Sequence, residues 1–140
     1  MITIQREFDS SIIDELKPHF VEDVGYTRDM AAAEMKSSMD CNSDDFCMII
    51  ARGEDKKIVG YILAWIPENR RYVYMGQAWC IAGHNVAESG MGMLIKWATE
   101  KDVDDIVCDT ARSTSAIYRA WEFIERSVSM VKSLRSVSNG

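Results

Sequence analysis

Three apolar stretches joined by short turns, between residues 46 and 82, constrain the fold of this chain more than any other feature. Residues 46–51 form a continuous apolar run, and residues 57–66 and 72–82 carry apolar side chains in partial alternation. Both patterns are typical of strands that lie in a covered sheet. Because turns this short join antiparallel neighbours, the sequence predicts an antiparallel meander.

Helix-like and strand-like stretches flank this meander on both sides. On the N-terminal side, the spacing of apolar residues predicts a strand over 2–8, a helix from Asp9 or Ser10 to about Phe20, and a helix over 28–39. On the C-terminal side it predicts helices over 90–101 and 114–124 and strands over 105–110 and 127–134. Strand–helix–strand units imply parallel, right-handed crossovers. We therefore expect one α+β domain over residues 1–140, with a mixed, mostly antiparallel sheet.

Composition excludes several classes of function. The chain has 140 residues, the size of one domain, and a formal net charge of −6 that does not suit the neutralisation of nucleic-acid phosphates. No apolar run approaches the ~20 residues of a membrane helix. The cysteines, which are Cys41, Cys47, Cys80 and Cys108, form no C-x-x-C pair. We expect no metal site, and buried or half-buried free thiols in a reducing, cytoplasmic compartment.

Two glycines, Gly90 and Gly92, stand where the third strand of the meander has ended and a helix is expected to begin. A glycine inside a helix costs ~1 kcal/mol relative to alanine. One interpretation is a phosphate cradle, because backbone N–H groups at a helix N-terminus bind anions. The other is a turn that needs space for close packing. Sequence reasoning leaves both open.

The order of the elements resembles that of the GNAT superfamily of N-acetyltransferases, and two motifs strengthen the resemblance. Gly90-Met91-Gly92 is similar to the glycine loop R/Q-x-x-G-x-G/A of that family. The stretch IYRAWEF, residues 117–123, is similar to the family motif l-Y-e-k-l-G-F. The resemblance implies a GNAT-like acyl-CoA N-acyltransferase fold with splayed central strands. It also implies acetyl-CoA as cosubstrate and an amine acceptor.

The resemblance further implies which residues meet acetyl-CoA. The loop that holds the pyrophosphate in the family corresponds to Ala87, Ser89, Gly90, Met91 and Gly92. Backbone groups that bind the pantetheine arm correspond to Cys80, Ile81 and Ala82, and the general acid toward the departing thiolate corresponds to Tyr118.

Four positions depart from the family pattern. Ala87 replaces the Arg or Gln of the loop, Glu88 adds a carboxylate, Gln77 stands where members carry a glutamate base, and Glu122 replaces a glycine. Two functions therefore stay open. One is acetyl transfer to a primary amine of a protein or small molecule. The other is a catalytically degenerate GNAT-like structural or interaction protein, such as a phage virion component in a homo-oligomer or larger assembly.

Several side chains have two interpretations each. Trp65 and Trp79 line an acceptor pocket or belong to the core, and Met35 and Met39 form an adaptable lip over that pocket or fill gaps in the core. His84 is a titratable base near the reaction or a histidine of a surface loop.

Overall fold

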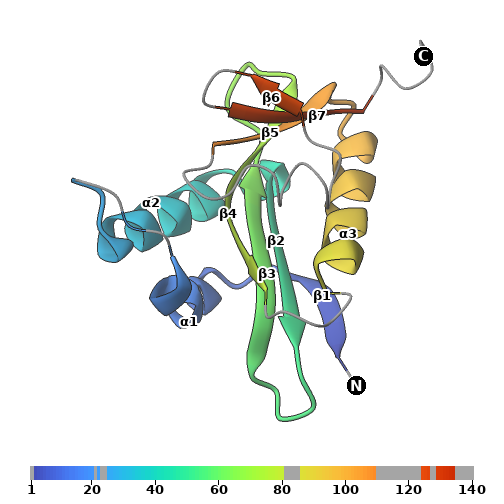
Figure 1. Cartoon of the computed structure of the whole chain (residues 1–140). Helices are drawn as coiled ribbons and strands as arrows, with labels where there is room; N and C mark the ends of the chain where they lie inside the picture. The colour runs from blue at the N-terminus through green and yellow to red at the C-terminus, as the bar shows by residue number, and fades with distance from the viewer. Residues whose placement is uncertain are drawn as a thin grey trace.

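A seven-stranded mixed sheet carries helices on both of its faces (Figure 1). The computed structural model describes residues 2–20, 22, 25–80, 86–109, 124–126 and 129–134. The strands are β1 (Thr3–Glu7), β2 (Phe46–Arg52), β3 (Ile58–Trp65), β4 (Tyr72–Cys80), β5 (Asp105–Asp109), β6 (Ile124–Arg126) and β7 (Ser129–Ser133). The helices are α1 (Ile13–Leu16), α2 (Arg28–Cys41) and α3 (Val86–Glu100), and 3-10 turns occupy η1 (Ser10–Ile12), η2 (Lys17–His19) and η3 (Ser43–Asp45).

The predicted meander is confirmed. The strands lie in the order β1-β2-β3-β4-β5-β7-β6, and β2, β3 and β4 pair antiparallel in sequence order. β1 adds an antiparallel edge to β2. Residues 46–51 of β2 are all buried because helices cover both faces of this part of the sheet. A strand buried on both faces reads as a continuous apolar run, as this one does.

Two hydrophobic cores lie on opposite faces of the sheet, and Figure 1 shows the helices that cover them. Under α3, the core includes Met91, Leu94 and Trp97 of the helix together with strand residues such as Ile49 and Ile106. Under α1 and α2, it is built from apolar residues of these helices and of β2 and β3, including Ile13, Leu16, Phe20, Met35, Met39, Met48 and Leu63.

The C-terminal strands differ from the prediction in one respect. The β4–β5 pair is parallel, as the crossover through α3 requires, but β5 pairs with β7 antiparallel. The reason is a short strand, β6, that the sequence pattern did not reveal and that includes Ile124, expected at the end of a helix. β6 pairs antiparallel with β7, and β7 therefore lies between β5 and β6. The predicted helix over 114–124 otherwise falls outside the described residues.

The β4–β5 ladder is short, and this divides β4 into two parts. Tyr72, Val73 and Tyr74 pair with Asp105, Ile106 and Val107, and the ladder ends there although β4 continues to Cys80. The paired end is held further by the Asp104 backbone N–H, which donates to the Arg71 carbonyl at 2.8 Å. The expected splay of the central strands is thus present in the described part of the chain.

A β-bulge lies at the end of this ladder. On β3 the consecutive residues Leu63 and Ala64 pair with Gln77 and Met75 of β4, so Gly76 is an extra residue. A bulge bends its strand and increases the local twist. The side chain of Trp65 packs against the bulge: a Cβ atom added to Gly76 would meet Trp65 Cη2 at 2.3 Å.

The expected helix over residues 10–20 is divided into η1, α1 and η2, with Pro18 inside the last turn. Proline in a helix interior removes a hydrogen bond and clashes with the preceding turn, which accounts for the change to 3-10 geometry. The Asp9 carboxylate caps the start by accepting from the Ser11 backbone N–H at 3.0 Å. None of the helices in the described part of the chain has the length and apolar character that a membrane span needs.

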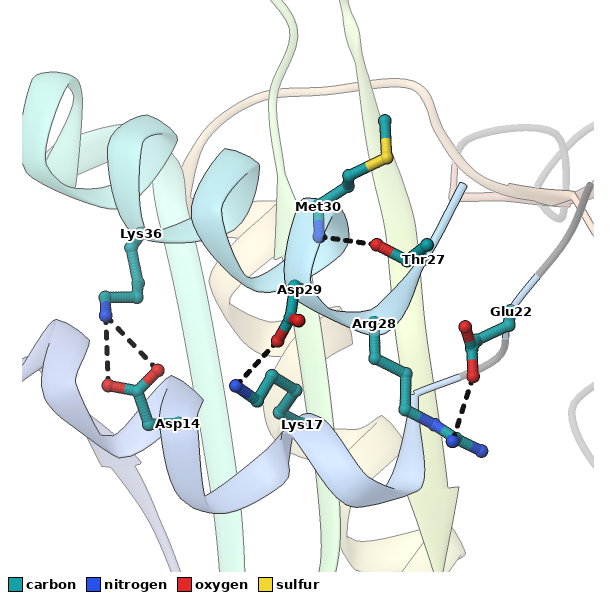
Figure 2. A network of polar contacts seen from close by, with 8 residues as sticks. All are labelled: Asp14, Lys17, Glu22, Thr27, Arg28, Asp29, Met30 and Lys36. Carbon is teal, nitrogen blue, oxygen red and sulfur yellow. Dashed lines mark hydrogen bonds and ion pairs between the residues drawn. The ribbon is translucent and has the colours of Figure 1, made fainter. Parts of the chain in front are cut away.

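Ion pairs tie α2 to the segment that precedes it (Figure 2). The pairs are Asp14–Lys36 at 2.9 Å, Lys17–Asp29 at 2.8 Å and Glu22–Arg28 at 2.9 Å. The Thr27 hydroxyl caps α2 by accepting from the Met30 N–H at 3.2 Å. Exposed pairs contribute little stability individually. The buried residues Ala31, Met35 and Met39 hold α2 against the sheet, and the ion pairs add links to the preceding segment.

Two glycine substitutions test the packing at the bulge. We expect Gly76→Ala to lower the free energy of unfolding by ~1–3 kcal/mol, because Trp65 occupies the space that the new methyl group needs. Gly92→Ala is the matched control: no heavy atom lies within 4 Å of its added Cβ, and it lies inside α3. We expect it to raise the free energy of unfolding by up to ~1 kcal/mol. Urea denaturation of both variants measures this, and equal effects would contradict the described bulge.

Candidate functional site

A cavity of about 200 Å³ lies between α2 and the sheet, beside the β-bulge. On the helical side it is lined by Tyr26, which precedes α2, and by Glu34, Met35 and Ser38. Ligand pockets commonly occur where packed elements diverge and leave concave space. This cavity begins where the β4–β5 ladder has just ended.

The sheet side of the cavity is mainly aromatic. It is formed by Trp65 of β3 and by Tyr74, Gly76 and Gln77 of β4. The rings of Trp65 and Tyr74 are 5.3 Å apart at an angle of 59°, and Trp65 stacks on Phe46 at 5.8 Å. Because Gly76 has no side chain, the Trp65 ring can lie directly on the bulge. The open interpretation of Trp65 is therefore settled: it packs against the core and also lines the cavity.

Glu34 is the one carboxylate among the described residues that line the cavity. Its side chain is exposed, and its Oε2 accepts a hydrogen bond of 2.9 Å from the Tyr26 hydroxyl. Partial burial, together with the hydrogen bond and the negative charge of Glu34, raises the pKa of Tyr26 to about 12. The Tyr26 hydroxyl therefore stays protonated at neutral pH and donates a hydrogen bond to Glu34.

Gln77 is buried and contributes to the wall at the point where the β4–β5 ladder has ended. Farther along β4, Trp79 stacks on His19 of η2, with ring centroids 3.9 Å apart and an interplanar angle of 20°. Trp79 does not line the cavity. Both methionines belong to the core, as the gap-filling interpretation predicts, and Met35 also lines the cavity.

The glycine pair lies inside a helix rather than before one. The expected helix start at Gly90 is wrong: α3 begins at Val86, so Gly90 and Gly92 lie in its second turn. The helix lengthens toward its N-terminus because Val86 is buried and, with Gly90 and Leu94, continues the apolar stripe at helical spacing. Backbone N–H groups are unbonded in the first turn of a helix, whereas those of the second turn bond within it. The N–H groups available to an anion at this end therefore belong to Val86, Ala87 and Glu88 of the first turn rather than to the glycines.

The two glycines differ from each other. Gly90 is buried, and an added Cβ would lie 3.4 Å from Ile62 Cδ1 of β3. This is an ordinary van der Waals distance, so packing alone does not require a glycine at position 90, and both interpretations of Gly90 stay open. Gly92 is exposed, and no atom of the described chain approaches its added Cβ within 4 Å. Met91 is buried in the core under α3, and Ser89 is exposed. Their contacts with acetyl-CoA stay a prediction.

The remaining predicted site residues lie at the end of β4 or beyond it. Cys80 is the last residue of β4 and is half-buried. Ile81, Ala82, His84 and Tyr118 lie outside the described residues, so their roles stay predictions.

The cysteines are free thiols. Cys47 and Cys108 are buried, but Cys41 is exposed, contrary to expectation, because it ends α2 on the solvent side. Burial raises the pKa of Cys47 to about 11, so this thiol is not a nucleophile at neutral pH. The described residues contain no group of three or more His, Cys, Asp or Glu side chains placed to hold a metal ion.

Sequence reasoning missed Glu34, Tyr26 and His19. Glu34 lies three residues after Ala31 and one before Met35, at the edge of the apolar stripe of α2. A charged residue at the edge of a buried stripe is a weak signal, because most such residues only face solvent. Tyr26 precedes the helix, and its contact with Glu34 depends on how the chain enters α2. That entry is not encoded in a short motif.

Comparison with known proteins identifies the fold. No protein family model matches the sequence, and no curated protein sequence matches it. Solved structures do match. A GNAT superfamily phosphinothricin acetyltransferase from Sinorhizobium meliloti, solved with AcCoA, is 15% identical, with a TM-score of 0.71 over 99% of this chain and 91% of that chain.

Two further solved structures agree. A PaiA N-acetyltransferase from Thermoplasma acidophilum, solved with coenzyme A, is 10% identical, with a TM-score of 0.66 over 94% of this chain and 96% of that chain. The match to nourseothricin acetyltransferase is partial: it has 15% identity and a TM-score of 0.55, and it spans 64% of this chain and 65% of that one. The chain therefore has the fold of the GNAT N-acetyltransferases, as the resemblance implied.

The titration of Tyr26 tests the geometry around Glu34. We expect this phenol to ionise near pH 12 instead of near pH 10, because burial and Glu34 favour its neutral form. Its contribution to stability is present below pH 10 and is lost as the pH rises through 12. The difference in absorbance at 295 nm between the wild type and Tyr26→Phe isolates this group. Ionisation near pH 10 would rule out the described contact, and Glu34→Gln should lower the pKa toward 10.

Proposed function

We propose that this protein transfers an acetyl group from acetyl-CoA to a primary amine. The observation that carries the proposal is the end of the β4–β5 ladder at Tyr74, directly beside a cavity lined by Gly76 and Gln77. An extended amide-bearing arm would lie along β4 beyond the ladder, in the manner of an added strand. An amine in the cavity would then meet the thioester beside Gln77.

The two reactants would approach from different sides. The N-terminus of α3 lies on the face of the sheet opposite α2 (Figure 1), so phosphates bound there would be separated from the cavity by the sheet. A helix N-terminus favours negative charge. The gap between β4 and β5 would connect the two sides. This separation supports a reaction in which both substrates are bound together, which reduces the entropic cost of their encounter.

The chemistry requires few groups from the protein. The neutral amine nitrogen attacks the thioester carbonyl carbon, a C–N bond forms, and the C–S bond breaks as the thiolate leaves. The nitrogen gives up a proton, and the thiolate takes one up. A backbone N–H of β4 would stabilise the oxyanion of the intermediate, and we assign Tyr118 as the acid that protonates the thiolate. Gln77 cannot accept the proton at neutral pH, which leaves that step to water.

Acetyl-CoA binding can be measured by thermal unfolding. At 100 times its dissociation constant, acetyl-CoA should stabilise the protein by ~2.7 kcal/mol, or roughly 8 °C in Tm for a domain of this size. ATP serves as a control for adenine and phosphates without the pantetheine arm, and it should give a smaller shift. An unchanged melt at millimolar acetyl-CoA would instead favour a GNAT-fold structural or interaction protein.

A charge reversal at the start of α3 tests where the phosphates lie. Glu88 is exposed in the first turn, where its charge is favourable to the helix dipole by ~0.3–1 kcal/mol. We expect Glu88→Lys to lower stability by that amount and to bind acetyl-CoA about tenfold more tightly.

Glu100→Lys at the other end of the same helix is the matched control. It makes the same change in charge, should raise stability because a cation suits the C-terminus of a helix, and should leave the affinity unchanged. If both variants changed the affinity equally, the phosphates would not lie at the N-terminus of α3.

A further inference from the structure

The lining of the cavity combines apolar side chains with one negative charge. Its sheet side presents the rings of Trp65 and Tyr74, and Met35 adds an apolar side chain from α2. The exposed Glu34 carboxylate supplies the negative charge. Such a cavity suits a molecule with an apolar stem and a cationic end, because aromatic rings and methionine accept methylene groups and a carboxylate attracts an ammonium.

Glu34 is poorly suited to bind the nitrogen that reacts. That nitrogen must be neutral when it attacks, and a carboxylate in contact with an ammonium raises its pKa and keeps it protonated. In addition, the Glu34 carboxylate already accepts a hydrogen bond of 2.9 Å from the Tyr26 hydroxyl. This hydrogen bond holds the carboxylate in one orientation. A fixed, exposed carboxylate is better placed to bind a cation that takes no part in the reaction.

We propose that the acceptor carries two amines, one that reacts beside Gln77 and a second that binds as an ammonium to Glu34. This inference rests on the proposed acetyl transfer and names its substrate class as a short aliphatic diamine. Glu34 is then a specificity-determining residue, and Tyr26 positions it. The cavity, of about 200 Å³, has room for a short aliphatic chain.

Three amines of equal stem length distinguish the possibilities: 1,5-diaminopentane, pentylamine and 5-aminopentanoate. At the end away from the reacting nitrogen, the diamine has a cation, pentylamine has no charge, and 5-aminopentanoate has an anion. Acetyl transfer is followed as CoA thiol release at pH 8. With the wild type we expect kcat/KM for the diamine to exceed that for pentylamine about tenfold. This is more than the factor of two that its two equivalent amines provide, and 5-aminopentanoate should be the poorest acceptor.

Glu34→Gln should remove the preference. The variant keeps the shape of the side chain and lacks the charge, so we expect KM for the diamine to rise to that for pentylamine, with kcat unchanged for both. Asp40→Asn is the matched control, because it removes one exposed carboxylate from the same helix away from the cavity. It should leave the preference intact. Tyr26→Phe, which frees the carboxylate, should reduce the preference to an intermediate value.

Several results would overturn the inference. Equal use of the diamine and pentylamine by the wild type would do so, as would a preference that survives in Glu34→Gln. A uniform fall in kcat for all three acceptors in that variant would make Glu34 the general base instead.

Calorimetric titration of the diamine separates this inference from the proposed function. Tighter binding of the diamine than of pentylamine, lost in Glu34→Gln, supports the cation site even if no acetyl transfer occurs. Absence of transfer with all acceptors would refute the transferase alone. Equal binding of the diamine by the wild type and by Glu34→Gln would refute the cation site alone.

Discussion

The bulge at Gly76 is the constraint on which the rest of the site depends. A parallel pair such as β4–β5 would ordinarily continue as far as both strands extend, because each unmade backbone hydrogen bond is costly when it is buried. Here the ladder ends at Tyr74, and the extra residue in β4 follows two positions later. A bulge turns its strand away from the previous direction. One inserted residue in β4 thus separates two strands that remain joined at their other end by Asp104 and Arg71.

The same glycine connects the gap to the cavity. Any side chain at this position would displace Trp65, whose ring lies where the Cβ would be. Trp65 in turn packs against Phe46 and Tyr74 and forms part of the cavity wall. On the opposite side, the buried residues Ala31, Met35 and Met39 hold α2, and thereby Glu34, against the sheet. Exposed ion pairs and the Thr27 cap add to this (Figure 2). Both walls of the site therefore depend on buried apolar packing.

Strong periodic patterns made most of the fold predictable. The apolar run of β2, the alternation in β3 and the stripe of α2 each identified their elements, because burial on one or two faces leaves a direct signature in sequence. Short or interrupted elements were less predictable. β6 spans only Ile124–Arg126, too few residues for any period to appear, and its absence from the prediction led to the wrong direction for the last strand beside β5. The start of α3 was missed because the two glycines indicated a turn, whereas burial of Val86 and Leu94 extends the helix across them.

The site was only partly predictable, for a different reason. Trp65 and Met35 were found because they are large and apolar, but the Tyr26–Glu34 contact depends on tertiary structure alone. The glycine pair is instructive here. An added Cβ at Gly90 would lie 3.4 Å from Ile62 Cδ1, which is an ordinary contact, so packing alone does not require this glycine. Gly92 has no such neighbour, yet it costs α3 ~1 kcal/mol relative to alanine. Nothing in the described chain offsets that cost. A ligand that approaches the backbone of α3 from solvent would offset it, as the binding interpretation of the exposed Gly92 predicts.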